Sequence, residues 1–280
     1  MSLEPCRPIV TAPLFPELLS GLLELLHGLR DDAWQKPTAC SGWSVKDVAL
    51  HLLGGEAGIL SRRRDAFTPG DVSIESWEQL VRLIDGLNRT WLEATRRLSP
   101  PVLVDLLQLL GRQTCEYFSA LSDNPDAPGD IVAWASDAPA PVWLELAREY
   151  SERWHHQQQI RDAIGMPGFA EARYLAPALD AFARGLPRSF ASVEAPPGTL
   201  VTLLAEGDGG GCWTLRREDE TWRLYAGSPQ DATATLALSA QVAWRVFCKG
   251  VSPGDAEQAA RIDGDVALAH RVLKTISIIG

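Results

Sequence analysis

From about residue 13 to 190, apolar residues recur at spacings of three and four, and this pattern predicts a series of amphipathic helices. The expected helices cover residues 13–30, 44–67, 73–98, 102–121, 142–164 and 174–190, and the last one bridges to the second part of the chain. Ser44 is the expected N-cap of the second helix, where Asp47 faces the exposed N–H groups of the first turn. Long helices with short connections predict an up-and-down bundle.

The pattern changes beyond the Pro-Pro-Gly sequence at residues 196–198. Short β-like runs separated by glycine-rich or acidic turns predict strands at 200–204, 212–215, 221–225 and 232–238, followed by helices at 240–249 and 265–274. The expected organisation is therefore a two-domain α+β protein. A helical bundle covers residues 1–170, and a small α/β domain with an antiparallel-rich sheet covers residues 171–280, with a boundary helix at about 171–195.

Composition and charge narrow the classes of function. Hydrophobic residues make up 46% of the chain and charged residues 22%, which favours a packed globular protein over a disordered one. We expect no membrane span, because every apolar run is interrupted, and no signal peptide, because a basic N-terminal region is missing. A net charge of −10 argues against nucleic acid as a partner. Five widely spaced cysteines without a CxxC pair favour a cytoplasmic protein without a disulfide framework.

The chain has five histidines, so their positions are informative. His51 lies among apolar residues of the second helix, where a lone histidine is usually a core residue bonded to a carbonyl. Glu152 and His156 are four residues apart on the fifth helix, so their side chains leave the same face and can reach one ion. Metal sites in bundles take ligands from facing helices, and His51 is available on another helix. Spacing alone leaves open a solvated polar face, and also a pairing of Glu152 with His155.

The residues around these positions resemble the mycothiol-dependent maleylpyruvate isomerase family. The resemblance rests on the tryptophan-containing loop that leads into the helix of His51 (residues 37–52), and on Glu152, His156 and the Ala-Ile-Gly sequence at 163–165. It covers nearly the whole chain. It implies a DinB-like metal-binding four-helix bundle followed by a sterol-carrier-like domain, with His51, Glu152 and His156 as the metal ligands. His156 is preferred over His155 because its distance to residues 163–165 fits the family.

The chain departs from the family at one position near these ligands. The family often has an aspartate three residues after the second histidine, whereas Gln159 occupies that position here. The departure removes a possible carboxylate partner of the ligand histidine.

The resemblance also implies a chemistry. Two imidazoles and one carboxylate would hold a divalent cation and leave a coordination position for water or a thiol; zinc is favoured, with nickel, manganese and iron as alternatives. The cation would lower the pKa of that thiol or water. In the family the thiol, mycothiol, adds to a cis double bond, rotation follows, and elimination gives the trans isomer; related members are regarded as thiol S-transferases. The expected partners are a low-molecular-weight thiol such as mycothiol and an electrophilic substrate.

Four further residues are weaker candidates for binding the thiol or the substrate. Arg62 and Arg63 could hold an acidic group, although a solvated basic run that balances the helix dipole is the plainer interpretation. Trp43 and Trp154 could line a pocket, although aromatic residues at helical spacing usually fill a core. We expect a thiol-dependent isomerase or S-transferase. The alternative is a carrier for a small apolar ligand that keeps a metal only for structure.

Overall fold

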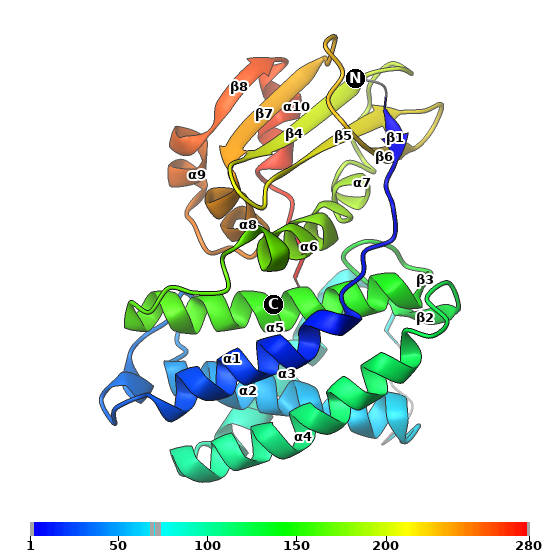
Figure 1. The fold of residues 1–280 in the computed structure, drawn as a ribbon. Helices are drawn as coiled ribbons and strands as arrows, with labels where there is room; N and C mark the ends of the chain where they lie inside the picture. Colours follow the sequence, from blue (N-terminus) through cyan, green and yellow to red (C-terminus); the bar gives the residue numbers. More distant parts are fainter. Residues whose placement is uncertain (1–2, 68–69, 71–73, 279–280) are drawn as a thin grey trace. The chain divides into compact units, whose positions relative to one another are not determined.

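The computed structural model describes residues 3–67, 70 and 74–278 (Figure 1). These residues form two compact units, and each unit is built from segments that are far apart in the sequence. The helical unit contains residues 12–124 and 153–169, whereas the mixed unit contains the first eleven residues together with 125–152 and 170–278. Within the described ranges, we find no helix with both the length and the apolar character needed to cross a membrane.

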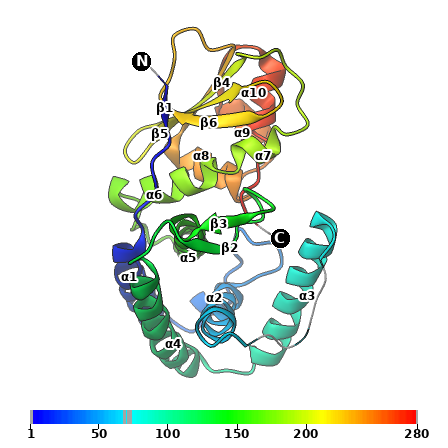
Figure 2. The same ribbon diagram turned by 90° about the vertical axis from the view of Figure 1, so that its right-hand side faces the viewer.

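The helical unit consists of long helices around a shared apolar core. Its helices are α1 (Phe15–His27), α2 (Val45–Ile59), α3 (Trp77–Thr95), α4 (Pro100–Leu121) and the second half of α5 (Val142–Ile164). Helix α2 contacts both α3 and α4, which lie on opposite sides of it in Figure 2. The core contains leucines, valines and an isoleucine from several of these helices, among them Leu26, Val48, Leu53, Leu107 and Ile160. The predicted N-terminal helical bundle is confirmed.

Helix α2 begins where the sequence predicts. The Ser44 hydroxyl accepts a hydrogen bond from the Asp47 N–H (3.3 Å), and the Asp47 carboxylate accepts one from the Ser44 N–H (3.0 Å). These reciprocal bonds satisfy N–H groups that a helix start leaves without partners. At its other end α2 continues into a π-helical turn, Leu60–Arg64. Ser73, the predicted start of the next helix, lies outside the described residues.

The mixed unit contains a six-stranded sheet with the order β1-β6-β5-β4-β7-β8. Its strands are β1 (Glu4–Pro5), β4 (Leu200–Glu206), β5 (Gly211–Arg217), β6 (Trp222–Ala226), β7 (Ala234–Ser239) and β8 (Arg261–Gly264). Neighbouring strands are antiparallel except β4 and β7, which are parallel and pair Val201 with Ala234. The predicted antiparallel-rich α/β part is therefore confirmed.

Helices and a separate hairpin complete the mixed unit. The helices are α6 (Ala172–Ala183), α7 (Leu186–Ser189), α8 (Ala240–Phe247), α9 (Pro253–Ala259) and α10 (Val266–Val272), and the hairpin pairs β2 (Pro128–Ile131) with β3 (Pro139–Pro141). Helices α8 and α10 both contact β4 and β7 (Figure 1). These contacts bury Leu203, Leu236 and Ala243.

Some elements differ from the sequence-based expectation. Residues 174–190 form two helices, α6 and α7, because Pro187 lacks the N–H that a continuous helix needs and its ring clashes with the carbonyl four residues earlier. Helix α4 includes Pro100 and Pro101, since proline is tolerated in the first turn. Strands β1, β2, β3 and β8 and helix α9 were not expected. These strands have two to four residues, too few to show an alternating pattern.

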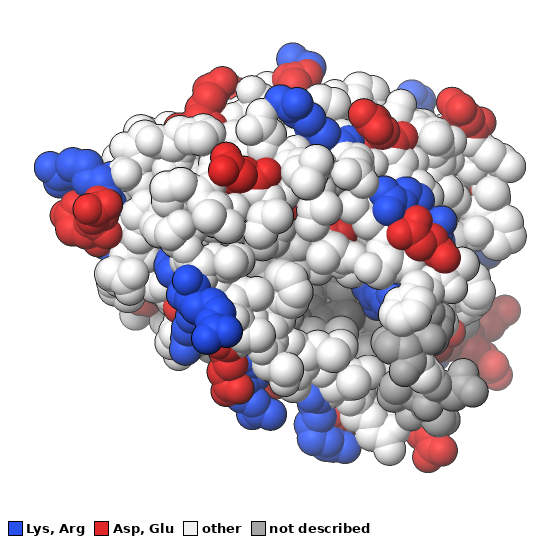
Figure 3. Space-filling model, turned by 90° about the horizontal axis from the view of Figure 1, so that it is seen from below, with Lys and Arg blue, Asp and Glu red and all other residues white. Residues whose placement is uncertain are grey.

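Acidic and basic side chains are mixed on the face of the molecule drawn in Figure 3. Exposed ion pairs join some of the charges on the protein, for example Arg64 with Asp65 (2.7 Å) and Arg261 with Glu206 (2.8 Å). Such exposed pairs are screened by solvent and salt, and they contribute little to stability. The buried cores of the two units therefore carry most of the stabilisation.

Candidate metal centre

Asp47 ties the start of α2 to the residue that follows α3. Its carboxylate accepts a hydrogen bond from Arg96 Nε at 2.8 Å. Burial by itself raises the pKa of Asp47, but hydrogen bonds from Arg96 and Ser44 outweigh it and lower the pKa below its ordinary value. Asp47 is therefore ionised at neutral pH, and it fixes the first turn of the helix that carries His51.

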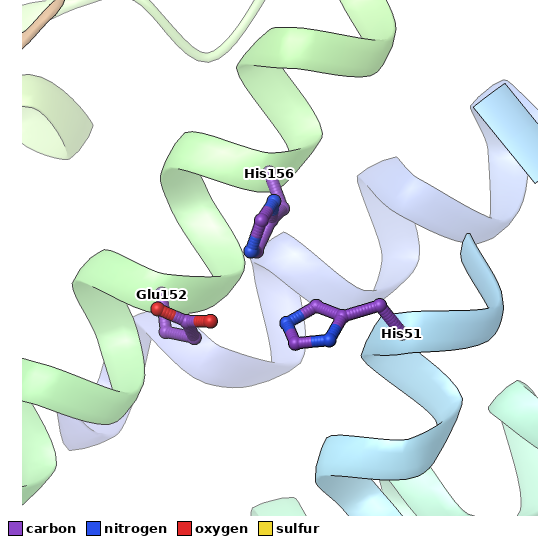
Figure 4. Close-up of side chains that lie close together, drawn as sticks. All are labelled: His51, Glu152 and His156. Atoms are coloured by element: carbon purple, nitrogen blue, oxygen red, sulfur yellow. The ribbon is translucent and has the colours of Figure 1, made fainter. Parts of the chain in front are cut away.

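Three side chains from two helices converge in the structure (Figure 4). His51 projects from α2, and Glu152 and His156 project from successive turns of α5. One ligand atom from each residue lies within 4.8 Å of the others. His51 and Glu152 are half-buried and His156 is buried, so the group is held by its surroundings but can be reached from solvent. The structure thus brings together the three residues that the sequence singles out.

The donor set fits a divalent cation. Two imidazole nitrogens and one carboxylate oxygen are the ligands of many zinc sites, at about 2.0–2.2 Å from the ion. Two atoms bound to one ion at that distance are at most about 4.4 Å apart. The three ligand atoms lie up to 4.8 Å apart, so small side-chain rotations would bring all of them within bonding distance of one ion. The carboxylate of Glu152 would supply negative charge, and the neutral imidazoles would supply lone pairs.

Aromatic rings surround the two histidines. The rings of His51 and His156 lie edge to face with centroids 4.7 Å apart, and the ring of Trp43 lies 5.1 Å from that of His51. Trp43 also borders a cavity of about 350 Å³, whose other walls include Asn88, Arg89 and Leu92 of α3. Trp43 is therefore placed between a candidate ligand and a space large enough for part of a small molecule.

Gln159 replaces the missing carboxylate in a way that the sequence did not reveal. Its side-chain oxygen lies 2.8 Å from His156 Nδ1, and the Cys40 thiol donates a hydrogen bond to the same oxygen at 3.0 Å. His156 therefore has a hydrogen-bonding partner at Nδ1, which leaves its other ring nitrogen, Nε2, for a cation. The spacing of three residues between His156 and Gln159 was the only local signal for this contact.

A buried ion pair next to the centre joins its two helices. Arg153, the neighbour of Glu152, donates to both carboxylate oxygens of Glu56 on α2, at 2.9 and 3.0 Å. The guanidinium also lies over the rings of Phe118 (5.2 Å) and Phe15 (5.8 Å). A two-pronged contact of this kind fixes the position of one helix along the other. It therefore helps to fix His51 against Glu152, because these two candidate ligands are carried by the two helices that the ion pair joins.

The other candidates lie elsewhere. His155 is buried beside His156, with ring centroids 4.1 Å apart, but it does not belong to the converging group. Trp154 is fully buried, and its indole N–H donates to the Phe169 carbonyl at 2.8 Å, so it serves the core rather than a pocket wall. Arg62 and Arg63 follow His51 by eleven and twelve residues, which is about 16–18 Å along a helix axis. Their role in binding an acidic group stays a prediction.

The comparisons with known proteins agree with this fold. The sequence model of the mycothiol maleylpyruvate isomerase N-terminal domain matches residues 15–161, which is more than half of the chain. The chain therefore belongs to this family. No curated protein matches it significantly.

A solved structure supports the fold over most of the length. The crystal structure of the mycothiol-dependent maleylpyruvate isomerase aligns with 91% of this chain and 92% of its own, at a TM-score of 0.53 and 14% sequence identity. A mutant of that isomerase aligns over the same shares, at a TM-score of 0.49 and 15% identity. The first likeness shows that the two proteins share a fold of a helical part followed by an α/β part.

Proposed function

We propose that this chain is a metal-dependent enzyme that activates a low-molecular-weight thiol for cis–trans isomerisation or for thiol transfer. The observation that carries the proposal is the convergence of His51, Glu152 and His156 from two helices of the family's bundle. The name of the family and that of the similar crystal structure both contain mycothiol and maleylpyruvate isomerase. These names support a small thiol and an electrophilic substrate as partners.

The three side chains would hold one divalent cation, with zinc favoured by two imidazoles and a carboxylate. When bound, such a cation lowers the pKa of a coordinated thiol or water, so that a nucleophile is available near neutral pH. Glu152 would balance part of the positive charge. The cavity beside Trp43 would hold the body of the thiol or the substrate, with Asn88 and Arg89 as its polar contacts.

The cysteines and the proposed thiol co-substrate also bear on the cellular compartment of the protein. All five cysteines are described, and none forms a disulfide. Unoxidised cysteines and a free thiol as co-substrate both suit a reducing compartment, and we propose the cytoplasm.

Metal content is the first test. The protein is purified without added metal, and bound metal is measured by elemental analysis for the wild type, His51→Ala and His156→Ala. We expect one divalent ion per wild-type chain and a large loss in both variants. His27→Ala is the matched control, because His27 is exposed at the end of α1. Unchanged metal content in both site variants would reject the centre.

Thiol binding is the second arm of this test. A thiol that binds the folded protein raises the melting temperature with the logarithm of its concentration over the dissociation constant. We expect mycothiol to stabilise the wild type, and Arg89→Met to weaken that response while retaining the metal. Arg82→Met is the control, because Arg82 is exposed on α3 and does not line the cavity. Bound metal without any response to thiols would favour the carrier function.

A further inference from the structure

We propose that Cys40 and Gln159 act as positioning residues that select the tautomer of His156, and that the uncharged amide of Gln159 supports weaker cation binding than a carboxylate at position 159 would. We call these two side chains the Cys40–Gln159 bracket. The inference rests on the proposed metal site. It assigns a role to two residues outside the group of three candidate ligands.

The first step concerns the ring proton of His156. A side-chain amide oxygen can only accept hydrogen bonds, so the 2.8 Å contact with Gln159 Oε1 requires a proton on His156 Nδ1. In a neutral imidazole the lone pair is then on Nε2, which is the nitrogen needed to bind a cation. If the amide of Gln159 turned over, its N–H would donate to Nδ1, and the proton would move to Nε2. The orientation of one amide therefore decides whether His156 can be a ligand.

The second step concerns Cys40, which favours the correct orientation of that amide. Its thiol lies 3.0 Å from the same oxygen and donates to it. A carbonyl oxygen has two lone pairs and can accept from the imidazole and the thiol together. An amide that had turned over would offer N–H groups to a thiol, which is only a weak acceptor. Gln159 is 4% exposed, so water cannot easily supply the lost bonds.

The third step concerns the loop that presents Cys40. Backbone hydrogen bonds at 3.0 Å close the loop, from the Thr38 N–H to the Trp43 carbonyl and from the Trp43 N–H to the Cys40 carbonyl. The Thr38 hydroxyl also accepts from the Cys40 N–H at 3.2 Å. One short segment thus places Cys40 against Gln159 and the Trp43 ring against His51. The loop positions the surroundings of both histidines from one side.

The fourth step concerns charge. A carboxylate at position 159 would make the imidazole of His156 a stronger electron donor and would add negative charge near the cation. The amide retains the geometry and omits the charge. Partners of ligand histidines change metal affinity by about 10–100-fold when they are altered. The cation should therefore be bound more weakly with Gln159 than with a carboxylate at this position. A cation that receives less negative charge from its surroundings polarises a bound thiol more strongly.

The test measures zinc affinity by competition with a chromophoric chelator. Gln159→Leu removes the acceptor at similar size and should weaken zinc binding by about 10–100-fold. Gln159→Glu keeps the size and adds the charge, and it should tighten zinc binding by about tenfold. Cys40→Ala should weaken binding less than Gln159→Leu, and Cys40→Ser should restore it, because a hydroxyl can donate to the same oxygen.

Matched controls separate this effect from general damage. Gln157→Leu makes the same change on the same helix, two residues away, and Cys115→Ala removes a thiol on α4. Both should leave the zinc affinity unchanged. Equal affinities for the wild type, Gln159→Leu and Gln159→Glu would overturn the bracket alone. Failure of the wild type to bind zinc would overturn the bracket together with the proposed function.

A second measurement does not depend on the variants folding. In the metal-free wild type, long-range ¹H–¹⁵N correlation spectra of the imidazoles identify which nitrogen of His156 carries the proton. We expect the proton on Nδ1. A proton on Nε2 would overturn the proposal even if every variant failed to fold.

Discussion

Helices α3 and α5 are both rich in polar residues, yet they lie in opposite environments. All of α3 is described, and Leu92 is its only buried residue. In α5 the polar side chains of Glu145, Glu149, His155 and Gln158 are buried. The sequence leaves open whether α5 presents a solvated polar face. The structure shows such a face on α3, whereas these polar residues of α5 are buried. A polar pattern therefore does not by itself distinguish a surface helix from a helix that carries a site.

The difference lies in the partners that the polar groups find. In α5, Arg153 binds the carboxylate of Glu56, and the Gln158 amide donates to the Gly168 carbonyl at 3.0 Å. A buried polar group costs free energy unless a partner within the protein replaces water. Such partners also fix side-chain positions, which a metal centre requires. Helix α3 has no comparable need, because water solvates most of its polar side chains.

Breaking the ion pair between α2 and α5 should have the largest effect. Glu56→Leu leaves the buried guanidinium of Arg153 without its carboxylate, and we expect a loss of about 3–5 kcal/mol in the free energy of unfolding. Urea denaturation measures this loss. The metal content should fall with it, because His51 and Glu152 are on the two helices that the pair joins.

Two variants sharpen this test. The double variant Glu56→Leu/Arg153→Met removes both charges and should recover much of the stability, since replacing a whole buried pair by apolar groups is often neutral. Arg82→Met on α3 removes an exposed charge and should leave the unfolding curve unchanged. A destabilisation as large as that of Glu56→Leu in this α3 variant would contradict the comparison.

The contact between Asp47 and Arg96 should have an intermediate effect that depends on pH. The folded protein lowers the pKa of Asp47, so the unfolded chain takes up a proton first as the pH falls. The stabilisation by this carboxylate is therefore complete above its ordinary pKa of about 3.9 and is lost as the pH falls through the lower folded value. Asp47→Asn should cost about 1 kcal/mol at pH 7.

The pH profile distinguishes this cause from simple loss of packing. Urea denaturation of the wild type and of Asp47→Asn at pH 7, 5, 4 and 3 should give a constant difference down to pH 5 and a shrinking one below it. A difference that stayed constant to pH 3 would mean that the charge of Asp47 contributes nothing. Ser44→Ala is a useful companion, because it removes one half of the same cap.

Local signals made much of the fold and the centre predictable. The cap at Ser44 and Asp47 fixed the start of α2, and a helix was expected at 142–164, where α5 lies. Given these helices, the spacing of Glu152 and His156 placed both on one face, and the family pattern supplied His51. Apart from His51, these inferences depend on residues close in sequence, for which helical geometry is known in advance.

The remaining features depend on contacts between distant residues. The thiol of Cys40 and the amide of Gln159 are 119 positions apart, and Arg153 and Glu56 are 97 apart. No local pattern marks either pair, because each becomes adjacent only once the helices pack. Strand β1 is similar, because its two residues, Glu4 and Pro5, pair with Ala226 and Tyr225 of β6, which are far away in the sequence. The sterol-carrier-like character of the second part and the role of Arg62 and Arg63 stay predictions.

We expect the smallest effects from two single substitutions. One replaces a polar residue on α5 by an apolar one, and the other replaces an apolar residue on α3 by a polar one. The side-chain oxygen of Gln157 on α5 is buried and has no hydrogen-bond partner among the described residues, whereas Leu87 on α3 is 57% exposed. Gln157→Leu removes this unsatisfied oxygen together with one long hydrogen bond, 3.5 Å from the amide nitrogen to the Leu18 carbonyl, and should change the free energy of unfolding by no more than about 1 kcal/mol. Leu87→Gln should change it by no more than about 0.5 kcal/mol. Urea denaturation measures both variants, and a loss well above about 1 kcal/mol in Gln157→Leu would show that the Gln157 amide, like its neighbours on α5, depends on its hydrogen-bond partner.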